Sequence, residues 1–125
     1  MKRTLVTSGS PFELEVGFSR AVRVGKIVEI AGTAPIGVDA PGDVYLQTKR
    51  CLAIMTAALA DAGADLRHVT RTRIMLTDIA HWPDAARAHG EVFGEIRPAS
   101  TVVAVSGFID PEWLVEIEAS AVVGG

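Results

Sequence analysis

Two arginines and two glutamates are the side chains of this sequence best suited to bind or activate a small molecule. Arg71 and Arg73 alternate along one predicted strand, and Glu116 and Glu118 alternate along another. Alternation directs all four to one face of the sheet. An arginine binds a carboxylate through paired hydrogen bonds, and a partly desolvated glutamate holds or activates a water molecule. The same four side chains also suit a structural ion-pair network at an interface, so both interpretations stay open.

Motifs for other kinds of chemistry are missing from the sequence. Neither GxxxxGK[ST] nor GxGxxG occurs, which argues against a nucleotide site, and no GxSxG supports a serine nucleophile. The three histidines, His68, His81 and His89, lack metal-binding spacing. The single cysteine, Cys51, forms neither a disulfide framework nor a cysteine-based zinc site, and we interpret it as a small core residue. We therefore expect no metal and no cofactor.

The composition indicates one domain over residues 1–125 with an unusually apolar surface. Hydrophobic residues make up 49% of the chain and charged residues 22%, and the mean hydropathy is +0.31. These values suggest that a partner covers part of the surface. The net charge of −3 argues against general nucleic-acid binding. The longest apolar run is half of what a bilayer span needs, and the N-terminus has no signal-peptide core, so we expect a soluble cytoplasmic protein without a membrane partner.

Hydrophobic periodicity predicts an α+β order, β-β-α-β-α-β-β, with two helices on one face of a sheet. A Gly25-Lys26 turn joins the first two strands. Asp43 caps the first helix, and Gly63 ends it. The second helix is expected to place Trp82, Ala86, His89 and Phe93 on its apolar face. The predicted ranges are strands at 18–24, 27–31, 69–77, 101–106 and 113–123, and helices at 43–62 and 82–94.

The strand at 101–106 is apolar on both faces, although two helices can cover only one face of the sheet. The missing cover should come from other copies of the chain. The pattern therefore predicts a closed homo-oligomer.

Four segments of this sequence together resemble a known family. They are Phe18–Gly25, Ile30–Thr33, Pro98–Thr101 and Val115–Ala119. They are similar to Tyr-Ser-Gln-Ala-Val-Arg-Val-Gly, Val-Ser-Gly-Gln, Pro-Ala-Arg-Ser and Ile-Glu-Ile-Glu-Ala of the RidA/YjgF family, the reactive-intermediate deaminases also called endoribonuclease L-PSP. The resemblance spans about residues 13–123.

This resemblance implies a single domain with a chorismate-mutase-like α+β fold, a homotrimer, and clefts between its subunits. It also implies hydrolysis of enamines and imines to 2-oxo acids and ammonia without a cofactor. In such proteins the signature arginine binds the substrate carboxylate, and the first glutamate of Glu-Ile-Glu helps to place water. Glu116 keeps this glutamate position.

The chain departs from the family at several cleft positions, which suggests a divergent branch. Ser100 replaces the signature arginine, Phe18 the tyrosine, Ala31 the serine, and Val102 a cysteine. Our hypothesis is that Arg73 supplies the missing guanidinium, ahead of Arg71 and Arg97. The expected site therefore has Glu116 and Arg73 as catalytic residues and the following substrate-binding residues: Phe18, Ala31, Ser100, Thr101, Val102 and Trp113.

Two functions of different kinds follow from this set. The first is a homotrimer that acts on a small carboxylate or carbonyl metabolite, by cofactor-free hydrolysis of an enamine or imine if it is an enzyme. The alternative is a non-catalytic trimer that binds a metabolite or regulates another protein. A nuclease, which the older family name suggests, is disfavoured by the acidic charge.

Overall fold

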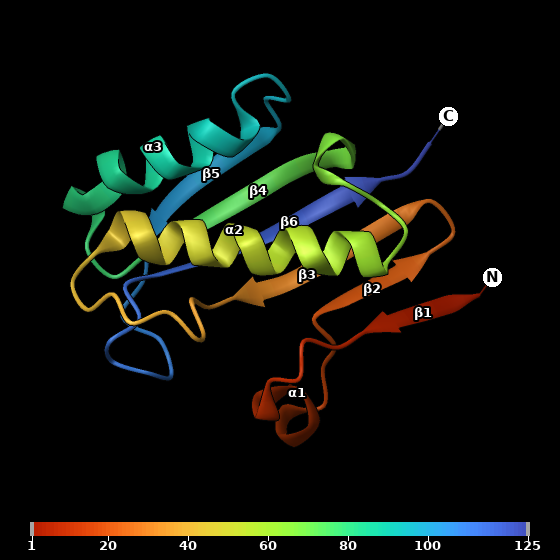
Figure 1. Ribbon diagram of the computed structural model, residues 1–125, viewed down its shortest axis with the longest axis horizontal. Helices are drawn as coiled ribbons and strands as arrows, with labels where there is room; N and C mark the ends of the chain where they lie inside the picture. The colour runs from red at the N-terminus through yellow and green to blue at the C-terminus, as the bar shows by residue number, and fades with distance from the viewer. Residues whose placement is uncertain (1, 125) are drawn as a thin grey trace.

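A six-stranded mixed sheet carries two long helices on one face (Figure 1). The computed structural model describes residues 2–124. The strands are β1 (Arg3–Val6), β2 (Ala21–Val24), β3 (Ile27–Thr33), β4 (Val69–Leu76), β5 (Ala99–Ala104) and β6 (Val115–Val122). Their spatial order is β1-β2-β3-β6-β4-β5, and only β4 and β5 run parallel. The expected α+β class and the order of the seven elements are confirmed.

The first long helix, α2 (Val44–Asp61), begins and ends at the expected signals. The Asp43 side chain accepts a hydrogen bond from the Leu46 amide at 2.9 Å, which satisfies a free helix N–H. Gly63 has a φ of 78°, which suits glycine after a helix. An apolar stripe of α2 faces the sheet, with Leu52, Met55 and Leu59 fully buried. Cys51 is buried beside it, and burial raises the pKa of its thiol, as expected for a core residue.

The second long helix, α3 (Trp82–Phe93), buries part of the predicted face, with Phe93 buried and Ala86 and His89 partly buried. Ala85, Ala88 and Phe93 face the core, whereas Trp82 is 54% exposed. The prediction for Trp82 was wrong because Pro83 places Trp82 at the first residue of the helix, beyond the reach of the sheet. Short 3-10 turns precede β4 and α3, at η1 (Leu66–His68) and η2 (Ile79–His81).

Two N-terminal elements, β1 and α1 (Pro11–Val16), were not predicted. Strand β1 has only four residues and pairs at the sheet edge with β2. Helix α1 has six residues, and Leu14 on it is 94% exposed. Such short segments carry too few residues for a period to be visible. Gly17, with a φ of 90°, turns the chain from α1 back toward β2.

Strand β5 lies at the opposite edge of the sheet and pairs only with β4 among the described residues. Its two-faced apolar pattern does not reflect burial within one chain, because Val102 is 37% exposed. The covering by further copies of the chain stays a prediction.

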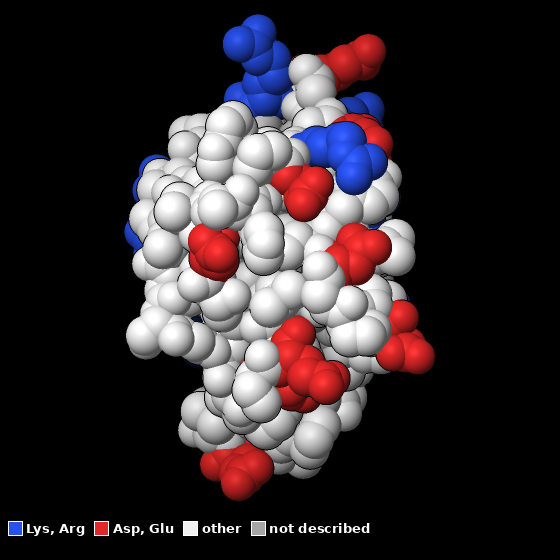
Figure 2. Space-filling view, turned by 90° about the vertical axis from the view of Figure 1, so that its left-hand side faces the viewer, with Lys and Arg blue, Asp and Glu red and all other residues white. Residues whose placement is uncertain are grey.

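The end of the molecule at which α2 and α3 begin is acidic (Figure 2). Asp43 at the start of α2 and Asp84 in the first turn of α3 lie at helix N-termini, where the helix dipole favours negative charge. This end would therefore repel a polyanion. Within residues 2–124, no helix combines the length and apolar character needed to cross a bilayer.

A buried amide, Gln47, joins two loops to α2. Its Nε2 donates to the carbonyl oxygens of Ala40 and Glu112, each at 3.1 Å. Its Oε1 accepts from the Leu114 amide at 2.8 Å. All three partners are backbone groups of irregular segments, so this one side chain fixes the loop that carries Trp113.

We expect Gln47→Leu to lower the free energy of unfolding by about 2–4 kcal/mol, because three backbone groups lose their partner while the side-chain volume barely changes. Urea unfolding followed by circular dichroism measures this. The neighbouring exposed change Leu46→Gln is the control and should stay within about 0.5 kcal/mol. Equal stability of the two variants would contradict the role given to Gln47.

Candidate functional site

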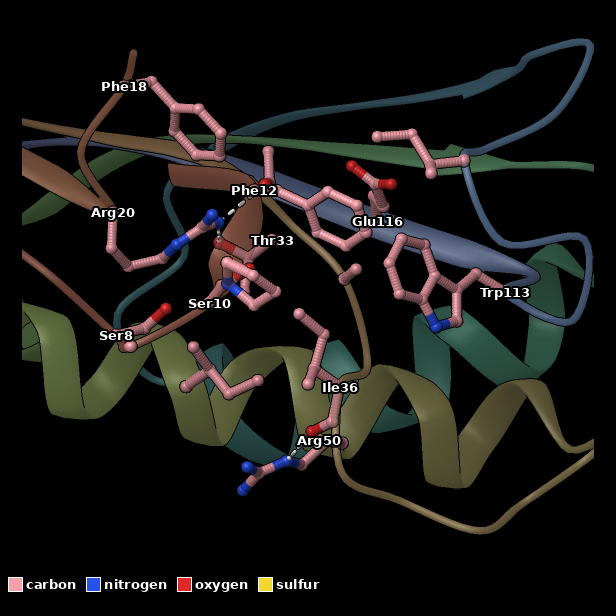
Figure 3. Close-up of a pocket in the computed structure, with 16 residues that line it drawn as sticks. Ser8, Ser10, Phe12, Phe18, Arg20, Thr33, Ile36, Arg50, Trp113 and Glu116 are labelled. Atoms are coloured by element: carbon pink, nitrogen blue, oxygen red, sulfur yellow. Dashed lines mark hydrogen bonds between the residues drawn. The ribbon is translucent and has the colours of Figure 1, made fainter. Parts of the chain in front are cut away.

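A pocket of about 280 Å³ lies between α1, α2 and the ends of β3 and β6 (Figure 3). Three aromatic and three isoleucine side chains form the bulky apolar part of its wall: Phe12, Phe18, Trp113, Ile36, Ile54 and Ile109. Its charged groups are few: Arg20 just before β2, Glu116 on β6, and Arg50 on α2. Apolar walls with a small number of polar groups are the usual composition of small-molecule sites.

Glu116 is the acid of this pocket. Its carboxyl group forms no hydrogen bond with the described residues, and its Oε1 atom lies against Gly32, where an added Cβ would come within 3.1 Å. Burial raises the pKa of Glu116, and the charge of Arg20 partly offsets this. Glu116 therefore keeps its proton to a higher pH than an exposed glutamate.

Arg20 is a buried basic side chain that lines the same pocket, with only 5% of its surface exposed. Its Nη1 atom donates to the Gly32 carbonyl oxygen at 2.6 Å and to Thr33 Oγ1 at 3.0 Å. Its guanidinium carbon lies 5.3 Å from the centroid of the Phe18 ring. In the view of Figure 3 the Arg20 guanidinium and the Glu116 carboxyl group lie on two sides of the Phe12 ring.

Glu13, on α1, balances the charge of Arg20. Its Oε2 atom lies 3.5 Å from Arg20 Nε, and both side chains are buried. The carboxylate also accepts hydrogen bonds from the Thr7 hydroxyl at 2.8 Å, the Ser8 amide at 3.1 Å, and the Ser8 hydroxyl. Burial alone would raise the pKa of Glu13, but these donors and Arg20 outweigh burial and lower it. Glu13 is therefore ionised and ties α1 to the pocket.

Two aromatic rings close the apolar side of the pocket. Phe12 from α1 meets Trp113 edge to face, with ring centroids 6.1 Å apart and an interplanar angle of 85°. Such contacts contribute about 1 kcal/mol beyond the area they bury. Because α1 contributes Phe12 and the loop before β6 contributes Trp113, the pocket depends on how these two irregular segments are held.

Three of the predicted site residues line this one pocket: Phe18, Trp113 and Glu116. Ala31 lies beside it: its amide donates to the Arg20 carbonyl oxygen at 3.0 Å, and its carbonyl oxygen accepts from Thr33 Oγ1 at 2.8 Å. Ala31 thus supports the chain around Arg20 rather than forming the wall.

The predicted residues of β5 lie elsewhere. Ser100 accepts a hydrogen bond from Thr72 Oγ1 at 2.8 Å, and Thr72 also contacts His89 Nε2 at 2.9 Å. Thr101 accepts from Arg71 at 3.3 Å, and Val102 lies exposed on the edge strand. Within one chain, the structure does not bring Ser100, Thr101 and Val102 to Glu116.

Arg73 also lies outside the pocket of Glu116. It lines a separate hollow on the open face of the sheet, together with Arg71 and Glu118. Its Nη1 atom forms a 2.9 Å ion pair with Glu118 Oε1. Of the two interpretations left open by the sequence, this geometry supports the structural ion pair.

The sequence prediction missed Arg20, Glu13 and Phe12. A signal for Arg20 is present, because it alternates with Phe18 and Val22 at the start of an otherwise apolar strand. A charged residue in that place needs a buried partner. The partner, Glu13, sits in a short helix that the sequence did not reveal.

The pocket has no metal-binding character. Across residues 2–124, no three His, Cys, Asp or Glu side chains are grouped so that they could hold a metal ion. Arginine side chains and a lone carboxyl group suit an organic ligand instead.

Comparison with known proteins places this geometry in a family. Residues 8–123 match the family model described as Endoribonuclease L-PSP. The chain belongs to this family, which is also called RidA/YjgF. A protein of Streptomyces coelicolor is 40% identical over 119 residues, covering 93% of this chain and 89% of the relative. The 3-aminoacrylate deaminase RutC of Acinetobacter baylyi is 32% identical over 124 residues, covering 96% and 97%.

Solved structures of RidA/YjgF proteins share the fold described above. A member of the YjgF/YER057c/UK114 family from Mycobacterium tuberculosis superposes with a TM-score of 0.92 at 47% identity, covering 98% of this chain and all of the other. A Pseudomonas aeruginosa protein superposes with a TM-score of 0.88 at 28% identity, covering 98% and 93%. The predicted family and fold class are therefore confirmed.

In this RidA/YjgF chain, Glu13 should contribute stability that depends on pH. Its pKa is lowered by folding, so its contribution is full above the ordinary value of 4.5 and is lost as the pH falls through the lower folded pKa. We expect Glu13→Gln to cost about 3 kcal/mol at pH 7, because Arg20 is left without its counter-charge. Urea unfolding at pH 7 and at pH 3 measures the change.

The matched control is Glu15→Gln on the exposed side of the same helix, which should change stability by less than about 0.5 kcal/mol. The difference between wild type and Glu13→Gln should shrink at pH 3. A difference of equal size at both pH values would contradict the ionised state of Glu13.

Proposed function

We propose that this RidA/YjgF protein hydrolyses a small enamine or imine that bears a carboxylate, without a cofactor. The observation that carries the proposal is Glu116: an acid with a raised pKa and no hydrogen-bond partner among the described residues, facing an arginine inside a largely apolar pocket. An acid in such a place can both donate a proton and take one back.

The proposed reaction uses both states of Glu116. Protonated Glu116 gives its proton to the enamine carbon, and the C=C electron pair forms the new C–H bond while the nitrogen lone pair forms a C=N bond. The resulting carboxylate accepts a proton from water as the water oxygen attacks the C=N carbon. That proton then passes from Glu116 to the nitrogen. As the C–N bond breaks and ammonia leaves, an oxygen lone pair forms the C=O bond of the oxo acid, and the hydroxyl proton returns to Glu116. One water is consumed for each ammonia released.

Two further observations support an enamine substrate. One relative that aligns along nearly the whole chain is described as a 3-aminoacrylate deaminase. The compound 3-aminoacrylate is an enamine that carries a carboxylate. The family glutamate position is kept as Glu116, and it is the acid that lines the pocket.

A non-catalytic trimer that binds a metabolite is the second candidate. Ser100 stands at the signature arginine position, and its hydroxyl is engaged with Thr72. Losing a bidentate carboxylate clamp removes an interaction that orients a substrate. Ammonia release separates the two candidates, because a pure binding protein releases none.

We expect Glu116→Gln to reduce kcat/KM for ammonia release by about 100-fold or more, because the amide can neither donate nor accept the proton that moves. The assay uses imino acids generated freshly by an amino acid oxidase, with 2-iminopropionate and larger imino acids compared against the buffer rate. Glu95→Gln, an exposed glutamate outside the pocket, is the control and should keep most of the activity.

Two results would count against the proposal. If wild type releases ammonia no faster than buffer for every imino acid, yet is stabilised by 2-oxo acids in thermal shift, the binding function is favoured. If Glu116→Gln and Glu95→Gln lose activity equally, the acid–base role of Glu116 is wrong.

We also propose that the chain acts as a cytoplasmic homotrimer whose interface uses the open face of the sheet. Ile27 and Val122 are neighbours on this face, paired across β3 and β6, and both are about half exposed. The Arg73–Glu118 pair lies on the same face, with Ser120 between Glu118 and Val122 along β6. An apolar patch with ion pairs around it is typical of a subunit interface.

Arg73→Ala should therefore weaken the trimer and leave ligand binding by the assembled protein largely unchanged. The loss of the pair leaves Glu118 uncompensated where the interface would bury it. Sedimentation over a concentration series and a binding titration above the assembly range measure the two effects. Lost binding with an intact trimer would instead support the substrate-holding role predicted for Arg73.

A further inference from the structure

We propose that Arg20 binds the carboxylate of the ligand, and that the ligand carries a large apolar side chain. The proposal rests on the proposed function only in placing the reacting carbon beside Glu116. Arg20 thereby takes the carboxylate-binding role that the sequence analysis had proposed for Arg73.

The position of Arg20 is fixed by its backbone and by half of its guanidinium group. Its amide donates to the Val6 carbonyl oxygen at 2.8 Å, and its own carbonyl oxygen accepts from Ala31 at 3.0 Å. Nη1 is held by Gly32 and Thr33. A cation that needs no rearrangement to meet its ligand binds at a lower entropic cost.

The other half of the guanidinium group remains available. Among the described residues, no hydrogen bond uses Nη2, and Nε is a buried nitrogen without a hydrogen-bond partner. Glu13 lies 3.5 Å from Nε, but its oxygens are already engaged by Thr7 and Ser8. Arg20 thus has Glu13 as a counter-charge on the Nε side and free N–H groups on Nη2. A carboxylate oxygen at Nη2 would satisfy them.

The remaining cation of the pocket is a weaker candidate. Arg50 is exposed on α2, and its Nε donates to the Ile36 carbonyl oxygen at 2.7 Å. In Figure 3 its guanidinium points away from Glu116. A ligand that reached Arg50 would not meet the acid.

The wall opposite Arg20 determines the rest of the ligand. Beyond Glu116 the pocket is lined by Phe12, Trp113, Ile36 and Ile109, and none of these offers a charge. A ligand with only a methyl group would leave this apolar surface in contact with water, whereas a branched or aromatic side chain covers it. We therefore assign the side chain of the ligand to the Phe12–Trp113 end.

The test compares acids with a neutral analogue in binding experiments, so it does not depend on catalysis. The probes are phenylpyruvate, pyruvate, and phenylacetone, which lacks the carboxylate. Wild type should bind phenylpyruvate at least tenfold more tightly than either of the other two. Isothermal titration calorimetry measures the affinities.

Arg20→Gln should weaken the affinity for phenylpyruvate at least tenfold and change the affinity for phenylacetone less than threefold. The glutamine amide keeps donors for Gly32 and Thr33 but removes the positive charge. Arg20→Lys, which keeps the charge, should retain part of the preference for the acid. The control is Arg67→Gln, an exposed arginine paired with Asp65 far from the pocket, which should leave all affinities unchanged.

Three outcomes would overturn the proposal. The first is an Arg20→Gln variant that weakens the acid and the neutral ketone equally, which would mean that Arg20 only supports the fold. The second is no binding of phenylpyruvate to wild type. The third is equal affinity for pyruvate and phenylpyruvate. If the affinities behave as expected but no ammonia is released, the assignment of Arg20 stands and the hydrolase function fails.

Discussion

The pocket of this protein depends on one buried cation. Arg20 enters the interior at the start of β2, where a charge is costly unless hydrogen bonds and a counter-charge surround it. The Gly32 carbonyl oxygen and Thr33 supply the hydrogen bonds from the end of β3. Glu13 supplies the counter-charge from α1. The position of α1, and with it the position of Phe12 over the pocket, therefore follows from the need to neutralise Arg20.

The same arrangement sets the properties of Glu116. The acid lies against the backbone at Gly32, the residue whose carbonyl oxygen holds Arg20. Close packing leaves it without a hydrogen bond among the described residues, and burial raises its pKa. Burying an acid in this way costs stability at neutral pH, since the charged form loses its hydration. A pocket acid whose pKa is raised by burial is typical of functional sites.

Sequence patterns were sufficient for the parts of the fold that repeat. The stripe on α2 and the alternation on β4 and β6 each span several periods, so both elements and the family resemblance were predictable. The prediction failed where a segment is short or its environment is not local. Helix α1 has six residues, and Trp82 is exposed at the start of α3.

The site was predictable only in part, for the same reason. Glu116, Phe18 and Trp113 were found from alternation and resemblance, and they line one pocket. Arg73 was chosen because it lies on the same face of the sheet as Glu116. In the structure its guanidinium pairs with Glu118 instead, outside the pocket of Glu116. Arg20 was overlooked because its partner, Glu13, is held by a helix with no sequence signature.

A crystal structure of the protein with phenylpyruvate tests the central claim most directly. The account predicts the carboxylate at Nη2 of Arg20, the oxo carbon facing Glu116, and the ring between Phe12 and Trp113. A carboxylate bound instead at Arg73 in the hollow on the open face of the sheet, with the pocket of Glu116 unoccupied by the acid, would contradict it.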